Sequence, residues 1–247
     1  MPTNLPLKGK AAVVTGATRG IGLAIAERLV TLGASVLATG RTDEHARQAR
    51  EQLMAAAGQD DKHHRVEVRA VDVRDYTAVE HAIAHAVERV GGLDILVNNA
   101  GIGTFAEVAA QSLEDWQNTI DTNLTGVFHC CRAAIPHLRR RGGGWIVNIS
   151  SLASKNPFAG AAAYCASKAG LNAFTEVLMQ EVRYDDIRVS CVLPGSVRTE
   201  FGGTRGGAGA EWKLAPEDVA RAVVDLLLHD PRSMPSRVEI RPSKPRK

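Results

Sequence analysis

Residues 10–33 read KAAVVTGATRGIGLAIAERLVTLG, and this stretch decides the fold. Residues 10–15 form a short apolar run that is typical of a buried strand. Three glycines follow, at Gly16, Gly20 and Gly22, and an Ala/Leu/Ile-rich helical pattern then continues to Leu32. Gly33 is a natural helix stop. The stretch therefore predicts a strand, a glycine-rich turn and a helix in direct succession.

A helix that begins after such a turn favours an anion, because its free N–H groups and its dipole both attract a phosphate. The spacing G-x-x-x-G-x-G differs from the usual G-x-G-x-x-G of dinucleotide sites. A tight turn without a ligand is the alternative. Three glycines in seven residues, placed between a strand and a helix, favour a dinucleotide site.

The rest of the chain continues to alternate strand and helix. This alternation indicates βαβ units and a parallel sheet, and right-handed crossovers then predict a doubly wound α/β domain of the Rossmann type. We expect a mostly parallel seven-stranded sheet with helices on both faces, in a single domain over residues 1–247. Further strands are expected over 34–39, 66–71, 94–98, 145–150, 187–193 and 237–241, and helices over 43–57, 75–90, 112–141 (bent near 123–126), 164–184 and 216–229.

Composition narrows the class of protein. The chain has 247 residues, a net charge of +3, 45% apolar and 23% charged residues, which is ordinary for a globular protein. That charge is too small to indicate a nucleic-acid or membrane partner. We see no apolar leader, no membrane-spanning run and no disulfide framework among the four cysteines, so a cytoplasmic location is expected. Residues 241–247 are interpreted as a basic, solvated tail.

The end of the second expected strand carries Gly40-Arg41 and no carboxylate. An NAD site usually has an acidic residue there to hold the ribose hydroxyls, and Asp43 lies past that position. A guanidinium instead suits the 2′-phosphate of NADP. Arg19, inside the glycine turn, favours the same cofactor. We therefore expect NADP(H) in preference to NAD(H), the alternative being that Arg41 only caps a solvated turn.

Tyr164 and Lys168 are four residues apart in a segment of helical pattern. Side chains at i and i+4 lie on one face of a helix. The ordinary pKa of Tyr is about 10, and a nearby ammonium favours the phenolate and lowers that pKa. Such a pair can act as the acid or base in carbonyl reduction or alcohol oxidation. From these two residues alone, an ordinary surface pair is the alternative.

Further motifs occur in order after successive expected strands: Asp72-Val73, Asn98-Asn99-Ala100-Gly101, and Pro194-Gly195 with Thr199. Together with residues 15–22 and Tyr164-x-x-x-Lys168, they resemble the short-chain dehydrogenase/reductase family over nearly the whole chain. The resemblance implies cofactor contacts from Gly16, Thr18, Arg19, Gly20, Ile21, Gly22, Arg41, Asp72, Val73, Asn99, Ala100, Gly101, Tyr164, Lys168, Pro194, Gly195, Val197 and Thr199.

The resemblance also implies a catalytic set of Asn123, Ser151, Tyr164 and Lys168, with no metal. Tyr164 exchanges the proton of the substrate oxygen, Ser151 hydrogen-bonds that oxygen, and Lys168 lowers the Tyr pKa and holds the nicotinamide ribose. Asn123 bends the long helix and links Lys168 to solvent through its backbone and a water. Ser150 is a rival for Ser151, because adjacent hydroxyls face opposite sides of an extended strand, but the family spacing favours Ser151.

In size and motif layout the chain is most similar to the 3-oxoacyl-carrier-protein reductases within that family. This implies NADP(H)-dependent interconversion of a carbonyl and a secondary alcohol, on a small-molecule or carrier-bound substrate, by a homodimer or homotetramer. Residues 236–242 depart from the family's glycine-rich ending. A non-catalytic NADP-binding regulatory or structural protein is the alternative, and the complete catalytic set argues against it.

The substrate side is the least informative part of the sequence. A glycine-rich segment between Phe201 and Trp212 is expected to form part of a flexible lid over about 200–215. An apolar pocket is expected from Ile102, Phe105, Leu152 and Phe158.

Three further features have plain explanations. His81-x-x-x-His85 and His63-His64 are more typical of solvated surfaces than of a metal site. Cys130-Cys131 is interpreted as packing. Residues 139–141, all Arg, indicate either a solvated helix end or a docking site for an acidic carrier protein.

Overall fold

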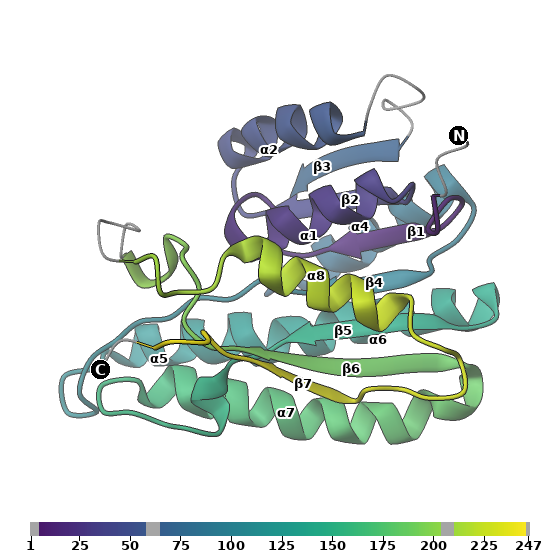
Figure 1. The fold of residues 1–247 in the computed structure, drawn as a ribbon. Coiled ribbons are helices and arrows are strands. Elements are labelled where there is room, and N and C mark those ends of the chain that lie inside the picture. The colour runs from purple at the N-terminus through teal and green to yellow at the C-terminus, as the bar shows by residue number, and fades with distance from the viewer. Residues whose placement is uncertain (1–4, 58–64, 204–209, 246–247) are drawn as a thin grey trace.

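Seven strands form one sheet in the order β3-β2-β1-β4-β5-β6-β7 (Figure 1). The computed structural model describes residues 5–57, 65–203 and 210–245. Every neighbouring pair is parallel, so the expected seven-stranded doubly wound sheet is confirmed. The strands are β1 (Ala11–Val14), β2 (Ser35–Gly40), β3 (Val66–Ala70), β4 (Ile95–Asn98), β5 (Gly144–Ile149), β6 (Ile187–Pro194) and β7 (Arg237–Ile240).

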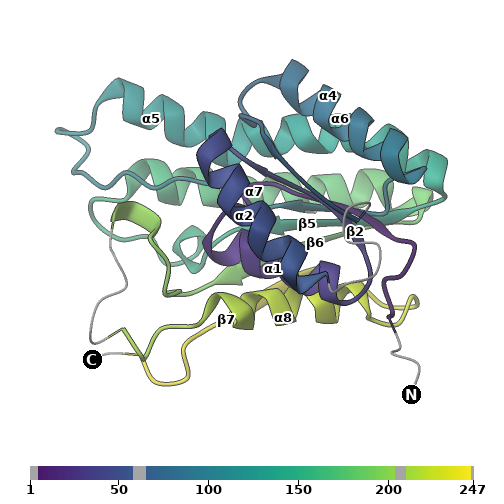
Figure 2. The same ribbon diagram turned by 90° about the horizontal axis from the view of Figure 1, so that it is seen from above.

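The helices form two layers, one on each face of the sheet (Figure 2). Helices α1, α2 and α8 contribute to the hydrophobic core on one face, and α4, α6 and α7 to the core on the other. Because both faces are covered, the central strands are mostly apolar, and all four residues of β1 and of β4 are buried. The helices are α1 (Gly20–Thr31), α2 (Asp43–Ala56), α4 (Tyr76–Val90), α5 (Leu113–Ile120), α6 (Gly126–Arg141), α7 (Ala162–Val182) and α8 (Pro216–Leu227).

The long helical stretch expected over 112–141 is interrupted where the bend was expected. A π-helical turn, Asp121–Thr125, separates α5 from α6. Gly126 follows it, and a Cβ on Gly126 would lie 2.7 Å from Val73 Cγ2, so the turn packs closely against the loop after β3. Other boundaries differ from expectation by one or two residues; α7, for example, ends at Val182 and is followed by a 3₁₀ turn, Arg183–Asp185.

Cys130 and Cys131 are both buried in the core beside α4 and α7, which confirms packing as their role. Within the described residues, no helix is both long and apolar enough to cross a membrane.

Asp94 connects the amino ends of the central strands by hydrogen bonds. The sequence motifs lie at the opposite, carboxyl ends of the strands. The carboxylate of Asp94 is almost completely buried and accepts hydrogen bonds from the Ala11 N–H and from Lys10 Nζ, both at 2.9 Å, and from Arg141 Nε at 3.3 Å. Burial alone would raise the pKa of this carboxyl, but these three donors outweigh it and hold the pKa below its ordinary value. The backbone of Asp94 also bonds β1 and β5, through Ala11 and Trp145.

Replacing Asp94 by Asn is therefore expected to lower the free energy of unfolding by about 2 kcal/mol at pH 7, because the charge-assisted hydrogen bonds are lost. The folded-state pKa lies below the unfolded one, so this stabilisation is present at neutral pH and disappears as pH falls through the lowered pKa. Urea unfolding at neutral and acid pH measures it.

Asp185→Asn is the matched control, because Asp185 pairs with Arg139 at the surface and a surface pair contributes about 0–1 kcal/mol. Equal losses for the two variants, or a loss at Asp94 that does not shrink in acid, would contradict the role given to Asp94.

Candidate active site

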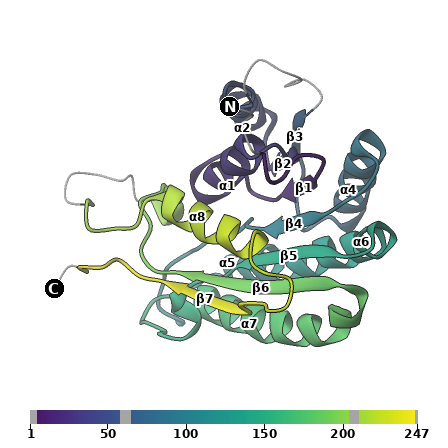
Figure 3. The same cartoon turned by 45° about the vertical axis from the view of Figure 1, so that its right-hand side comes forward.

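A cleft of about 1300 Å³ opens at the carboxyl ends of the strands. Sheet order reverses between β1 and β4, and in open α/β sheets ligands bind in the crevice outside this switch point. The cleft is lined by the turns that follow β1, β2, β3, β4, β5 and β6, by the start of α2, and by the segment after β7. In Figures 1 and 3 the coloured chain after β7 and the coloured parts of the segment between β6 and α8 lie at the same end of the sheet.

The turn after β1 is locked to the loop after β4. Thr15 Oγ1 accepts hydrogen bonds from the backbone N–H groups of Asn99 and Ala100, at 3.0 and 3.1 Å. Asn99 Nδ2 donates in return to the carbonyls of Thr15 and Gly16. Gly16 has a positive φ of 61°, and a Cβ there would lie 2.7 Å from Ala100 Cα; one on Gly22 would lie 2.3 Å from Asn99 Nδ2. Only glycine fits at these two positions. We call the resulting rigid turn, residues 15–22 packed against Asn99 and Ala100, the glycine cradle.

The cradle suits an anion. Helix α1 starts with no side-chain cap and no acidic residue in its first turn, so its N–H groups are available. Arg19 and Arg41 line the cleft here, and Thr18 packs over Gly40. Asp72 also lines this end, but Arg74 binds its carboxylate with both Nε and Nη2, and that hydrogen bonding lowers the pKa of Asp72. A dinucleotide phosphate therefore fits these residues.

Tyr164 and Ser151 form the reactive end of the cleft. Tyr164 lies in the first turn of α7, its ring between those of Phe105 and Phe201, with centroids 6.0 and 5.4 Å away. Ser151, two residues after the end of β5, lies near the Tyr164 hydroxyl and acts to lower its pKa. Ser151 Oγ accepts from the Ala153 N–H at 3.1 Å, which leaves the serine proton to be donated toward the tyrosine oxygen or a substrate oxygen.

Ser150, the rival of Ser151, differs from it in its surroundings. It is buried, and its hydroxyl donates to the backbone carbonyl of Lys168 at 3.3 Å. It therefore anchors α7 to the end of β5, whereas Ser151 is the serine beside Tyr164.

Lys168 lies one turn after Tyr164, is almost completely buried, and donates from Nζ to the Ile149 carbonyl at 2.8 Å. Its ammonium was expected to lower the pKa of Tyr164, and that expectation is wrong for this structure. Burial raises the pKa of Tyr164, against the opposing effect of Ser151. Burial also lowers the pKa of Lys168, to about 8, because the charged form loses its hydration.

Asn123 lies behind the wall of the cleft and connects segments that carry site residues by hydrogen bonds. In the π-helical turn, its Oδ1 accepts from the Ile102 N–H at 2.8 Å and its Nδ2 donates to the Ile102 carbonyl at 2.9 Å. Nδ2 also donates to Ser167 Oγ at 3.0 Å, and Ser167 in turn donates to the Tyr164 carbonyl. Asn123 thus joins the loop after β4 to the first turns of α7, and does not itself line the cleft.

The structure brings the expected site residues together with two exceptions. Gly22 and Asn123 lie behind the wall of the cleft, and all the other expected cofactor and catalytic residues line it. The apolar residues expected at the substrate side, Ile102, Phe105, Leu152 and Phe158, line it too.

Two groups of residues that line the cleft were not predicted from the sequence. The start of α2 contributes Thr42, His45, Gln48 and Gln52, which no motif indicates. Arg241, Pro242 and Pro245 also line the cleft, so part of the basic tail expected over 241–247 borders the site, with Arg241 and Pro245 exposed.

Several of the histidines and arginines singled out in the sequence form hydrogen bonds or ion pairs within the protein. His85 hydrogen-bonds Arg69 and Glu67, and across the described residues no group of three or more His, Cys, Asp or Glu could hold a metal. Arg139 pairs with Asp185 and Arg141 with Asp94, so this arginine cluster is largely occupied. His63, His64 and lid residues 204–209 lie outside the described residues.

Residues 10–207 match the family model described as short chain dehydrogenase. Among curated proteins, the 3-oxoacyl-[acyl-carrier-protein] reductase of Chlamydia pneumoniae is 35% identical over 232 residues, 90% of this chain and 91% of that protein. The 3beta-hydroxysteroid dehydrogenase 1 of Eggerthella lenta is 39% identical, over 87% of this chain and 85% of that protein.

Solved structures are similar over the whole fold. An alcohol dehydrogenase of the archaeon Thermococcus sibiricus, complexed with 5-hydroxy-NADP, matches with a TM-score of 0.86 and 30% identity, covering 96% of this chain and 98% of the other. A metagenomic short-chain oxidoreductase in complex with NADP matches with a TM-score of 0.81 and 36% identity, covering 96% of this chain and 99% of the other.

The chain belongs to the short-chain dehydrogenase/reductase family. It is an oxidoreductase of this family, whose members act on CH–OH and C=O groups.

Because burial lowers the pKa of Lys168, we expect its buried ammonium to destabilise the protein. Its folded pKa of about 8 lies below the unfolded value of 10.5, so the cost of burial is fully present below pH 8 and declines as pH rises toward 10.5. Lys168→Met should therefore raise the free energy of unfolding of the cofactor-free protein at pH 7, by on the order of 3 kcal/mol, and this gain should shrink above pH 8. Denaturant unfolding between pH 7 and 10 measures it.

Lys8→Met, at an exposed lysine, is the control and should change stability by no more than about 0.5 kcal/mol. A Lys168→Met protein that is less stable than the wild type at pH 7, or whose gain does not depend on pH, would be inconsistent with a charge buried at this cost.

Proposed function

We propose that this protein interconverts a carbonyl and a secondary alcohol with NADP(H), using Tyr164 as the acid/base. The observation that carries the proposal is one cleft that is lined both by the glycine cradle and by Ser151, Tyr164 and Lys168. The cradle residues would hold the phosphates of a dinucleotide, and Tyr164 lines the same cleft, where a bound nicotinamide would supply the hydride.

The nicotinamide cofactor supplies the hydride, which adds to the carbonyl carbon. Ser151 donates a hydrogen bond to the carbonyl oxygen and fixes its position. Tyr164 gives its hydroxyl proton to that oxygen, which completes the alcohol and leaves a tyrosinate. Lys168, on the same face of α7 and with a pKa of about 8, is a group that can return the proton to Tyr164. Oxidation runs through the same steps in reverse.

NADP(H) is favoured over NAD(H) by the charges at the cradle end. Arg19 and Arg41 face the cleft where a 2′-phosphate would lie, and no carboxylate stands at the end of β2. The structures of three similar proteins contain NADP or a derivative of it.

The substrate side accepts a bulky, partly apolar molecule. The rings of Phe105 and Phe201 contact Tyr164, Phe158 stacks on Phe105, and Trp212 lines the same cleft. Similar proteins are named as a 3-oxoacyl-carrier-protein reductase and as 3beta- and 3alpha-hydroxysteroid dehydrogenases, so 3-oxoacyl thioesters and steroid ketones are the two substrate classes to test first.

A homodimer or homotetramer built on the long helices is part of the proposal. Phe128 on α6 and Leu113 and Trp116 on α5 are exposed. On α7, Ala166, Ala169 and Ala173 face solvent rather than the protein's own sheet, which leaves room for a second helix to approach closely. Light scattering tests this, and a monomer would contradict it.

NADPH oxidation with a panel of β-ketoesters, 3-oxoacyl thioesters, diketones, quinones, sugars and steroid ketones tests the proposed function. We expect turnover with at least one carbonyl class. No turnover with any of them, in protein that binds NADPH, would favour the non-catalytic alternative.

The cofactor preference has its own test, with kcat/KM measured for NADPH and NADH at a fixed carbonyl concentration. Arg41→Ala should lower kcat/KM for NADPH by about 10- to 100-fold, because a charge-assisted hydrogen bond of about 1.5–3 kcal/mol is lost, and should leave NADH nearly unchanged. Arg47→Ala is the control, because Arg47 is exposed on α2 and does not line the cleft. A wild type that prefers NADH would refute the NADP assignment.

A further inference from the structure

The chain after β7 forms part of the wall beside the reactive residues. The Gly195 N–H donates to the Ile240 carbonyl at 2.8 Å, which joins this segment to the loop after β6. A Cβ on Gly195 would lie 3.1 Å from Pro242 Cδ and 3.3 Å from Leu152 Cδ1. Pro242 therefore packs beside the turn that follows Ser151, and Arg241 comes to line the cleft that contains Tyr164.

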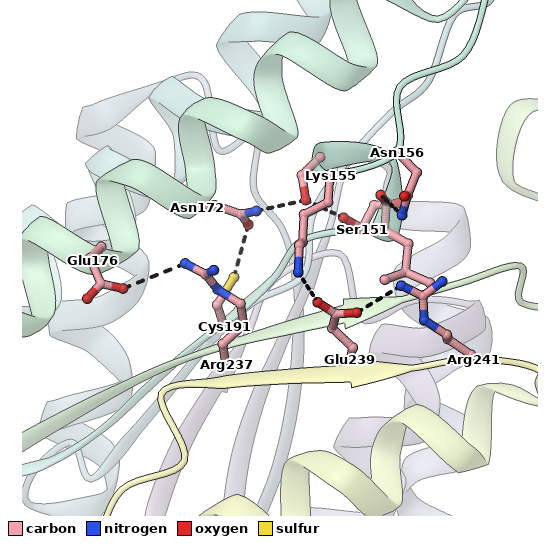
Figure 4. A network of polar contacts seen from close by, with 11 residues as sticks. Ser151, Lys155, Asn156, Asn172, Glu176, Cys191, Arg237, Glu239 and Arg241 are labelled. Carbon is pink, nitrogen blue, oxygen red and sulfur yellow. Dashed lines mark hydrogen bonds and ion pairs between the residues drawn. The ribbon is translucent and has the colours of Figure 1, made fainter.

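An ion-pair cluster sets the direction of the Arg241 side chain (Figure 4). Glu239 lies between two cations, with Oε1 bonded to Lys155 Nζ and Oε2 accepting from Arg241 Nη2 at 2.9 Å. These hydrogen bonds, the one from Lys155 first, lower the pKa of Glu239. In Figure 4 the guanidinium of Arg241 points away from its strand, toward the segment that carries Ser151 and Asn156.

Arg241 keeps donors to spare. A guanidinium has five N–H groups, and Glu239 is the hydrogen-bond partner of Arg241 among the described residues, through one nitrogen. The side chain is 57% exposed, so the remaining donors are open to a molecule in the cleft.

The cleft as a whole is positive. Of the described residues that line it, two are carboxylates, and each is paired: Asp72 with Arg74, and Glu200 with Arg19 at 3.4 Å. The reactive end therefore has a cation at its mouth and no unpaired carboxylate within the described lining. The positive lining residues are Arg19, Arg41, Lys168, Arg198, Lys213 and Arg241.

We propose that Arg241 is a specificity-determining residue that binds an anionic group, a carboxylate or a phosphate, on the carbonyl substrate. The proposal rests on the carbonyl-reductase function above and narrows its substrate class to carbonyl compounds with a negative charge remote from the reacting carbon. Glu239 and Lys155 act as positioning residues that orient the guanidinium.

Arg241→Gln tests the proposal, because glutamine keeps a donor and removes the charge. Arg237→Gln is the matched control: Arg237 is the first residue of β7, the strand that precedes Arg241, pairs with Glu176 and does not line the cleft. Kinetics at saturating NADPH use two matched pairs of substrates. Acetoacetate against ethyl acetoacetate probes a carboxylate, and acetoacetyl-coenzyme A against the N-acetylcysteamine thioester of acetoacetate probes phosphate.

For Arg241→Gln we expect KM to rise about tenfold or more for the anionic member of at least one pair. KM should change less than about twofold for the neutral members, and kcat should change little. The pair that responds identifies the anion. The wild-type KM for that anionic substrate should also rise with ionic strength, and the variant's should not. Equal changes for anionic and neutral substrates, or the same changes in Arg237→Gln, would overturn the proposal.

A binding measurement separates this proposal from the proposed function. Calorimetric titration of the enzyme–NADP⁺ complex compares hexanoate with hexanamide, and coenzyme A with pantetheine. If no carbonyl is turned over, the reductase function fails, while tighter binding of an anion that is lost in Arg241→Gln still supports an anion site. Equal binding within both pairs excludes such a site.

Discussion

The site depends on the close packing of the turn after β1 against the loop after β4. Thr15 Oγ1 bonds two successive N–H groups of that loop, and Gly16 and Gly22 allow the backbones to approach to distances that any Cβ would prevent. This junction stands at the switch point of the sheet. It fixes the phosphate end of the cleft, and because Asn99 and Ala100 lead into the loop that Asn123 clamps, it also fixes that loop relative to α7.

A second set of buried polar contacts connects this junction to the reactive residues. Asn98 Nδ2 donates to Asn148 Oδ1 at 2.8 Å across the paired ends of β4 and β5, and Asn148 donates on to Thr175 of α7. Such contacts are strong only when their geometry is satisfied, so they hold the two strand ends and the helix in one arrangement. Ser151 leaves the end of β5, and Tyr164 and Lys168 stand on α7. The distances between these three residues are thus set by the core rather than by flexible loops.

The fold could be predicted almost completely, because its signals are local. Apolar runs of strand length, glycines at helix starts and ends, and the family motifs each depend on a few neighbouring residues. The proposed catalytic residues were found from motif spacing for the same reason, and three of them, Ser151, Tyr164 and Lys168, line one cleft. Two properties could not be predicted, because they depend on burial by distant parts of the chain: the raised pKa of Tyr164 and the contribution of Arg241 to the cleft. In the sequence, Arg241-Pro242 gives no sign of a cleft. These residues come to line the cleft because β7, the strand before them, pairs with β6.

The central claim is that Tyr164 transfers the proton to the substrate oxygen. It is tested most directly by measuring kcat and NADPH affinity for Tyr164→Phe, in which the ring is kept and the hydroxyl is removed. We expect kcat to fall by at least about 10³-fold, within the range of a lost general acid, while the Kd for NADPH changes less than about threefold. A variant that binds NADPH normally and keeps a tenth or more of the wild-type turnover would contradict it.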